Sequence, residues 1–139
     1  MPTSPDWSTS TAPSLDDLER LAIAAWNRLP VEIRQTCGDV VIRLEEFATD
    51  DVLDSLGIES PFDLMGLYQG VSLDRRSTGD FAREPDMVFL YRRAILDYWA
   101  DSGDETLADL VTHVLVHEIG HHFGLSDADM EAIEASVTA

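Results

Sequence analysis

Apolar residues recur at three- and four-residue spacing in the segment between Ser14 and Pro30. This spacing places them on one face and predicts an amphipathic helix over about residues 15–29. Ser14 is a suitable N-cap, acidic residues occupy the first turn, and Pro30 cannot continue the helix. The apolar face is formed by Leu18, Leu21, Ala22, Ala25, Trp26 and Leu29.

The pattern changes after Gly38. Residues 40–45 are rich in β-branched side chains and partly alternating, which predicts a strand. Glycines interrupt residues 66–73, which we expect to form a strand or hairpin arm at a sheet edge. The other predicted elements are a short helix at about 50–56, a surface loop at 74–86, a buried strand at 87–91, and helices at about 93–100, from 104 to 122 or 123, and at about 127–135.

This order of elements predicts a single α+β domain over residues 14–139 with a three- or four-stranded sheet. A Ser/Thr/Pro-rich tail covers residues 1–13 and has neither the basic nor the apolar region of a signal peptide. Apolar runs of the ~20 residues needed to span a bilayer are absent, so a cytoplasmic protein without a membrane partner is the default expectation. Cys37 is the only cysteine, which excludes an intramolecular disulfide and a cysteine-based zinc cluster. We interpret it as an inert thiol.

The charge is strongly negative. The chain has 27 acidic and 9 basic residues, and its formal net charge is -18. Such a surface repels phosphate backbones, so nucleic acid is not expected as a partner. A solvated acidic surface is the simplest interpretation, although it would also concentrate metal cations or basic substrates.

The helix expected from residue 104 carries the chemistry. His117 and His121 are four positions apart, so they differ by about 40° in direction and about 6 Å in height and can aim imidazole nitrogens at one ion. Glu118 lies about 100° round the helix, where it can hold a water molecule and take its proton without binding the metal. Because buried His and Glu side chains are costly without partners, this apolar helix favours a metal site.

A catalytic zinc site needs a third protein ligand. His113 is unsuitable because residues 113 and 121 lie about 12 Å apart along a helix axis, and His122 points about 100° away from His121. Gly124 allows a positive-φ turn that ends the helix and reverses the chain. Asp127 then returns to the metal as the third ligand, and two imidazoles plus one carboxylate favour zinc.

The string from His117 to Asp127 resembles the extended HExxHxxGxxD motif of zincins with an aspartate ligand, related to the metzincin pattern. Over about residues 15–135 the chain resembles the minimal zincin-like metallopeptidase family of small bacterial proteins. The segments that carry this resemblance are 63–71, 89–93 and 117–127.

The resemblance implies a small zincin-like domain with a mixed sheet and a buried active-site helix. It also implies a zinc-dependent peptidase in which His117, His121 and Asp127 bind zinc and Glu118 is the general base. Zincins bind peptide or protein substrates as an extended strand along a sheet edge, and residues 66–73 are the candidate edge. The metzincins place a methionine beneath the metal, and Met130 is either its substitute or a core residue.

Two other functions remain open at this point. The first is a zinc-stabilised domain that binds a peptide or partner without cutting it, and the second is an interaction module without a metal. The roles of four further residues are also open. Tyr68 and Tyr91 are core aromatics or oxyanion donors, His113 makes a hydrogen bond rather than binding metal, and His122 is either packed or part of a cleft. The substrate and the oligomeric state do not follow from the sequence.

Overall fold

The computed structural model describes residues 6–70 and 85–138 of the chain. Residues 6–13 form neither helix nor strand. The elements in chain order are α1 (Leu15–Arg28), α2 (Val31–Cys37), β1 (Val40–Glu45), α3 (Asp50–Leu56), the 3₁₀ helix η1 (Pro61–Asp63), β2 (Gly66–Gln69), β3 (Asp86–Tyr91), α5 (Arg92–Ser102), α6 (Leu107–Phe123) and α7 (Asp127–Thr138).

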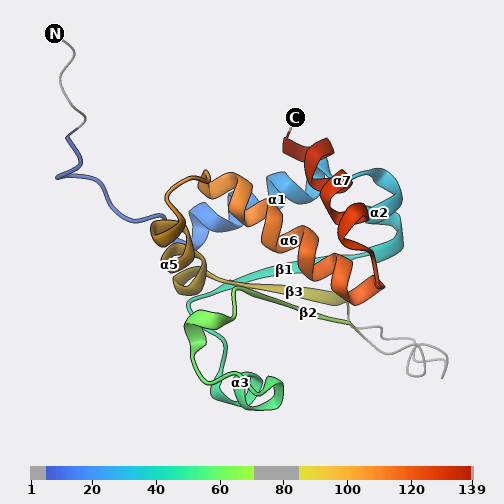
Figure 1. Ribbon diagram of the computed structural model, residues 1–139, viewed down its shortest axis with the longest axis horizontal. Helices are drawn as coiled ribbons and strands as arrows, with labels where there is room; N and C mark the ends of the chain where they lie inside the picture. The colour runs from blue at the N-terminus through green and yellow to red at the C-terminus, as the bar shows by residue number, and fades with distance from the viewer. Residues whose placement is uncertain (1–5, 71–84, 139) are drawn as a thin grey trace, which may run out of the picture.

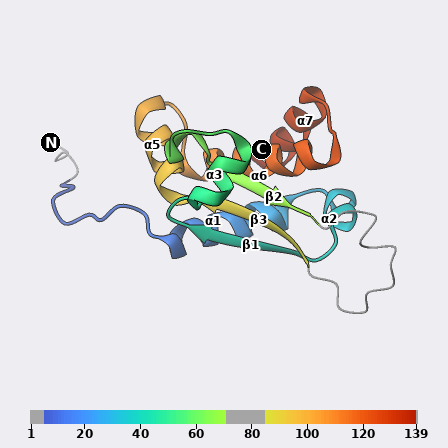
Figure 2. The same ribbon diagram turned by 90° about the horizontal axis from the view of Figure 1, so that it is seen from below.

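The described strands form a three-stranded mixed sheet in the order β1-β3-β2. Strand β1 is parallel to β3, with Val40 opposite Asp86, and β2 is antiparallel to β3, with Tyr68 opposite Val88. Figure 2 shows β3 between its two neighbours. The predicted α+β class and the edge position of β2 are confirmed. Residues 71–73 of the predicted edge segment lie outside the described residues.

Helices α1 and α6 pack on one face of the sheet and enclose the main core. Figure 1 shows α1, α6 and α7 on one side of the sheet and α3 on the other. Alternate side chains of β3, Val88 and Leu90, enter this core and are fully buried. Leu18 and Ala22 from α1 meet Leu115 and other apolar residues of α6 there. The helix that carries the motif is therefore fixed by burial on two sides.

A smaller apolar cluster covers part of the other sheet face. Tyr91 and Phe89, which alternate with the main-core residues of β3, pack with Leu53 of α3 and Ala94 of α5. Burial raises the pKa of Tyr91 to about 12. Because its side chain is only 2% exposed, the core interpretation of Tyr91 is confirmed.

Local signals explain most helix ends. The predicted capping box at Ser14 is present: its side chain accepts from the backbone N–H of Asp17, whose carboxylate accepts from the N–H of Ser14. Ser126 and Asp129 form the same reciprocal pair at the start of α7. Gly57 ends α3 in the left-handed region, as its position predicts. The two reciprocal pairs, at the starts of α1 and α7, satisfy backbone N–H donors that a helix leaves unpaired.

Three sequence predictions need correction or limitation. The prediction that the long helix begins at residue 104 is wrong, because Thr106 caps α6 by accepting from the N–H of Asp109. Helix α2 was not predicted, since it is short and lies between Pro30 and Gly38. Asp86 belongs to β3 rather than to the preceding loop, whose residues 74–84 lie outside the described part of the chain.

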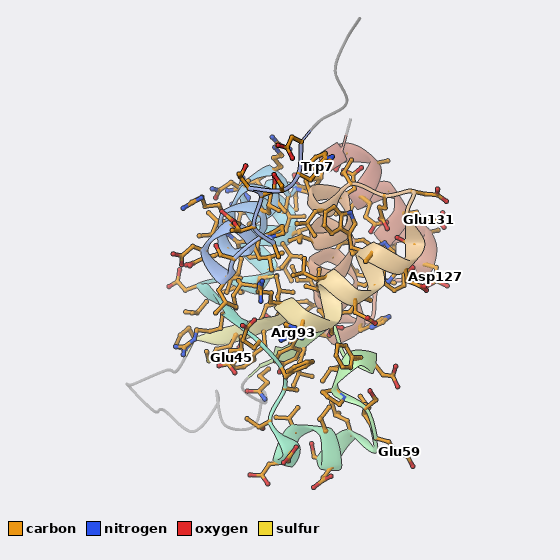
Figure 3. All side chains as sticks on the ribbon, turned by 90° about the vertical axis from the view of Figure 1, so that its left-hand side faces the viewer. Trp7, Glu45, Glu59, Arg93, Asp127 and Glu131 are labelled. Atoms are coloured by element: carbon orange, nitrogen blue, oxygen red, sulfur yellow. The ribbon has the colours of Figure 1, made fainter. Side chains whose placement is uncertain are left out.

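Acidic side chains are spread over the surface rather than gathered in one place. Glu45 lies on β1, Glu59 lies between α3 and η1, and Asp127 and Glu131 lie on α7 (Figure 3). None of the helices in the described ranges combines the length and the apolar character that a membrane span requires. Cys37 is 5% exposed, and burial raises the pKa of its thiol to about 11, helped by the charge of Asp86. Its thiolate is therefore scarce at neutral pH, as expected of an inert thiol.

Candidate metal centre

Three histidines follow one another along α6 at four-residue spacing. The ring centroids of His113 and His117 are 4.0 Å apart, and those of His117 and His121 are 5.8 Å apart with planes at 87°. The apolar residues on the other sides of α6 are buried in the core. Their burial fixes the direction in which the histidine side of the helix faces. His117 is the middle histidine and can bind a metal together with either His113 or His121.

The predicted positive-φ turn at Gly124, which ends α6 before Asp127, is present. Gly124 has φ 70° and ψ 30°, and its N–H donates to the carbonyls of Gly120 and His121. Leu125 also donates to the Gly120 carbonyl, at 2.8 Å. This pattern ends α6, and α7 begins three residues later at Asp127.

The strain that this turn would place on another residue can be measured. Gly124→Ala should destabilise the protein by about 1–2 kcal/mol, because an L-residue with a Cβ is disfavoured at positive φ. Gly103→Ala is a matched control, since Gly103 ends α5 at φ 71° and neither glycine has an atom within 4 Å of an added Cβ. Urea unfolding should show a similar loss for both, while only Gly124→Ala should weaken zinc binding. Wild-type stability in Gly124→Ala would contradict the account.

His117 is held in the form that binds a metal. Burial lowers the pKa of its imidazole, and the neighbouring rings of His113 and His121 lower it further. The carboxylates of Glu134 and Asp127 act in the opposite direction without reversing the shift. A neutral imidazole has a free lone pair, so the environment of His117 fits a transition-metal ligand.

The carboxylate nearest to the histidines is one that the sequence did not single out. Glu134 of α7 places Oε1 2.5 Å from Nδ1 of His113 and 3.9 Å from Nε2 of His117. In the described ranges, the group of potential ligand atoms that lie within 4.8 Å of one another consists of these three residues. Asp127 is outside that group, and its charge is felt at His117. Glu134 follows Asp127 by seven residues, two helical turns, and that spacing is the signal by which it could have been found.

Glu118 lies between α6 and the edge strand β2. Its Cγ is so close to Gly66 that a Cβ there would come within 3.2 Å of it and within 2.9 Å of Val114. Burial raises the pKa of Glu118, while the charge of His121 and a hydrogen bond from the backbone N–H of Tyr68 lower it in part. The carboxylate is therefore oriented by the strand that we expect to meet a substrate.

Tyr68 and His122 form a second contact between β2 and α6. The Tyr68 hydroxyl donates to the buried carboxylate of Asp86 at 2.7 Å, and its ring stacks on His122 at 4.0 Å. Since Tyr68 is 8% exposed, its core interpretation is confirmed. His122 is exposed, and its ring contacts the rings of Tyr68 and Phe123.

Comparison with known proteins agrees with the predicted family and fold. The sequence model of the zincin-like metallopeptidase family matches residues 37–137, which include the sheet, helices α3, α5 and α6, and all of α7 except its last residue. The chain therefore belongs to the zincin-like metallopeptidase family. No curated protein sequence matches it. The predicted family and fold class are confirmed, and the ligand set and the general base remain predictions.

Proposed function

We propose that the chain is a zinc-dependent peptidase in which His117, His121 and Asp127 hold the metal and Glu118 is the general base. The observation that carries the proposal is the position of Glu118, next to His117 and packed against Gly66 of the edge strand. Family membership supports the reaction class. The donor set of two imidazoles and a carboxylate suits zinc and leaves a coordination position free for water or substrate.

When bound, zinc supplies Lewis acidity that lowers the pKa of a water molecule and polarises the carbonyl of a peptide bond. Glu118 accepts the proton of the attacking water at a carboxylate oxygen and passes it to the nitrogen of the leaving amine. The N–H of Tyr68 holds the carboxylate in place during both transfers. Because burial disfavours the charged carboxylate, it also makes Glu118 a stronger base than an exposed glutamate.

The outer edge of β2 is the proposed binding site for the substrate backbone. The carbonyl of Met65 accepts from the N–H of Tyr91, so alternate residues of β2 pair with β3. The N–H of Tyr68 points the other way, towards Glu118. An extended peptide added to this edge would therefore lie next to the general base. The absence of a Cβ at Gly66 keeps β2 close to α6.

Digestion of a defined peptide library by the zinc-loaded protein tests the proposal. New peptide termini, detected by mass spectrometry, should appear with the loaded protein. They should disappear after treatment with a zinc chelator and return when zinc is added. Stoichiometric zinc without any cleavage would overturn the peptidase assignment and favour a zinc-stabilised peptide-binding domain.

A further inference from the structure

Helix α7 runs antiparallel to α6 and presents two carboxylates to it. Met130 of α7 packs against Gly120, and Glu134 meets His113, so rising residue numbers on α7 meet falling numbers on α6. Positions 127, 130 and 134 share one face of a helix. The carboxylates of Asp127 and Glu134 are therefore two turns apart on the side of α7 that faces the histidines.

The histidine ladder and the two carboxylates offer two donor sets of the same composition. His117 and His121 are followed by Asp127 near the end of α6, and His113 and His117 are followed by Glu134 two turns away. Each group offers two imidazoles four residues apart and one carboxylate, a donor set for zinc and related metals. We call His113, His117 and Glu134 the upper set. We call the proposed catalytic ligands, His117, His121 and Asp127, the lower set.

The geometry of the upper set is close to that of a coordinated ion. Its three ligand atoms lie within 4.8 Å of one another. Donor atoms of a tetrahedral zinc site with bonds of ~2.1 Å are about 3.4 Å apart, so side-chain movements of about an ångström suffice. All three side chains are partly exposed, at 44% for His113, 30% for His117 and 20% for Glu134, and can make such movements. The contact between Nδ1 of His113 and Glu134 then gives way to the metal, and the neutral imidazole carries its one ring proton on Nε2.

Solvent and charge both favour a cation at this place. A surface pocket of about 220 Å³ opens beside the upper set. Its acidic lining attracts cations to His113 and Glu134, which are part of that lining. The pocket is lined by Glu105, Asp109, Thr112, His113 and Glu134.

We propose that the upper set is a second zinc site and that the two sets exclude each other because they share His117. A neutral imidazole has one unprotonated nitrogen and binds one ion. Zinc bound by the upper set therefore takes His117 away from the lower set. A protein with its zinc in the upper set would be inactive as a peptidase. The exclusion rests on the proposed function, since it takes the lower set to bind zinc, whereas the existence of the upper set does not.

Zinc affinity measured by competition with a chromophoric chelator tests this inference without reference to activity. Asp127→Asn removes the lower set and Glu134→Gln the upper one, so each single variant should keep one site. The double variant should bind zinc at least roughly tenfold more weakly than either single variant, because even outer-shell partners of metal-ligating histidines have effects of that size. His117→Asn should match the double variant. Glu131→Gln, an exposed change on the same helix, is the control and should bind as wild type.

The variants separate the two proposals. If the double variant binds zinc as well as Asp127→Asn does, the upper set does not exist. If Asp127→Asn binds as wild type and Glu134→Gln alone loses the metal, the ligand set of the proposed function is wrong and the upper set stands. His113→Asn in the Asp127→Asn background should reproduce the double variant. It removes the same set from α6, so agreement excludes a folding defect in α7.

Discussion

Glu118→Gln is expected to lower kcat for peptide hydrolysis by roughly two to four orders of magnitude while zinc remains bound, because general-base catalysis contributes about that much. Glutamine has the same shape as glutamate, and its amide oxygen can still accept from the N–H of Tyr68. The amide cannot take up the proton of the attacking water. The variant therefore removes one chemical function and leaves the packing of the side chain against Gly66 intact.

Two measurements must accompany the rate. Elemental analysis should find the same zinc content in Glu118→Gln and in the wild type, since Glu118 is not one of the proposed ligands. Glu131→Gln makes the same chemical change at an exposed site on α7 and should keep full activity. A Glu118→Gln protein that cleaves peptides at the wild-type rate would show that Glu118 is not the general base.

The sequence was most informative about α6, because the spacing of its candidate site residues and the signal for its C-terminal end are both local. The spacing of His117, Glu118 and His121, and the glycine that ends the helix, are local features, and α6 ends at Phe123 with Gly124 at φ 70°. The start of α6 was placed three residues too early because an acidic residue at 104 resembles a helix start. Gly103 ends α5, and the N-cap of α6 is Thr106, whose side chain accepts from the N–H of Asp109.

The contacts of the site between different elements were not readable from the sequence. Glu134 meets His113 only because α7 folds back on α6, and that packing depends on tertiary structure rather than on spacing along the chain. The hydrogen bond from Tyr68 to Glu118 likewise needs β2 to lie against α6. Sequence patterns identified the side chains able to do chemistry, whereas their partners come from the way the helices and the edge strand pack.

The close approach of α6 and α7 is expected to depend on one pair of residues, Gly120 and Met130. Met130 is 1% exposed and belongs to the main core, which confirms its interpretation as a core residue. A Cβ added at Gly120 would lie less than 2.5 Å from the Met130 sulfur and 2.7 Å from its Cγ. Gly120→Ala should destabilise the protein by about 1–3 kcal/mol through overpacking, less the ~1 kcal/mol by which alanine favours a helix. Met130→Ala should cost about 2–5 kcal/mol through the cavity that it leaves.

The double variant distinguishes a direct contact from two independent effects. In Gly120→Ala/Met130→Ala the new methyl group enters the space that the methionine side chain has left, so the loss of stability should be smaller than the sum of the single losses. Urea unfolding of the four proteins measures this coupling, which is typically about 0.5–3 kcal/mol for residues in contact. Additive losses would mean that Gly120 and Met130 do not set the helix spacing.

Because α7 carries both Asp127 and Glu134, Gly120→Ala should also weaken zinc binding by moving α7 away from the histidines. The double variant should recover part of that affinity, since the helices can approach again once the methionine side chain is gone.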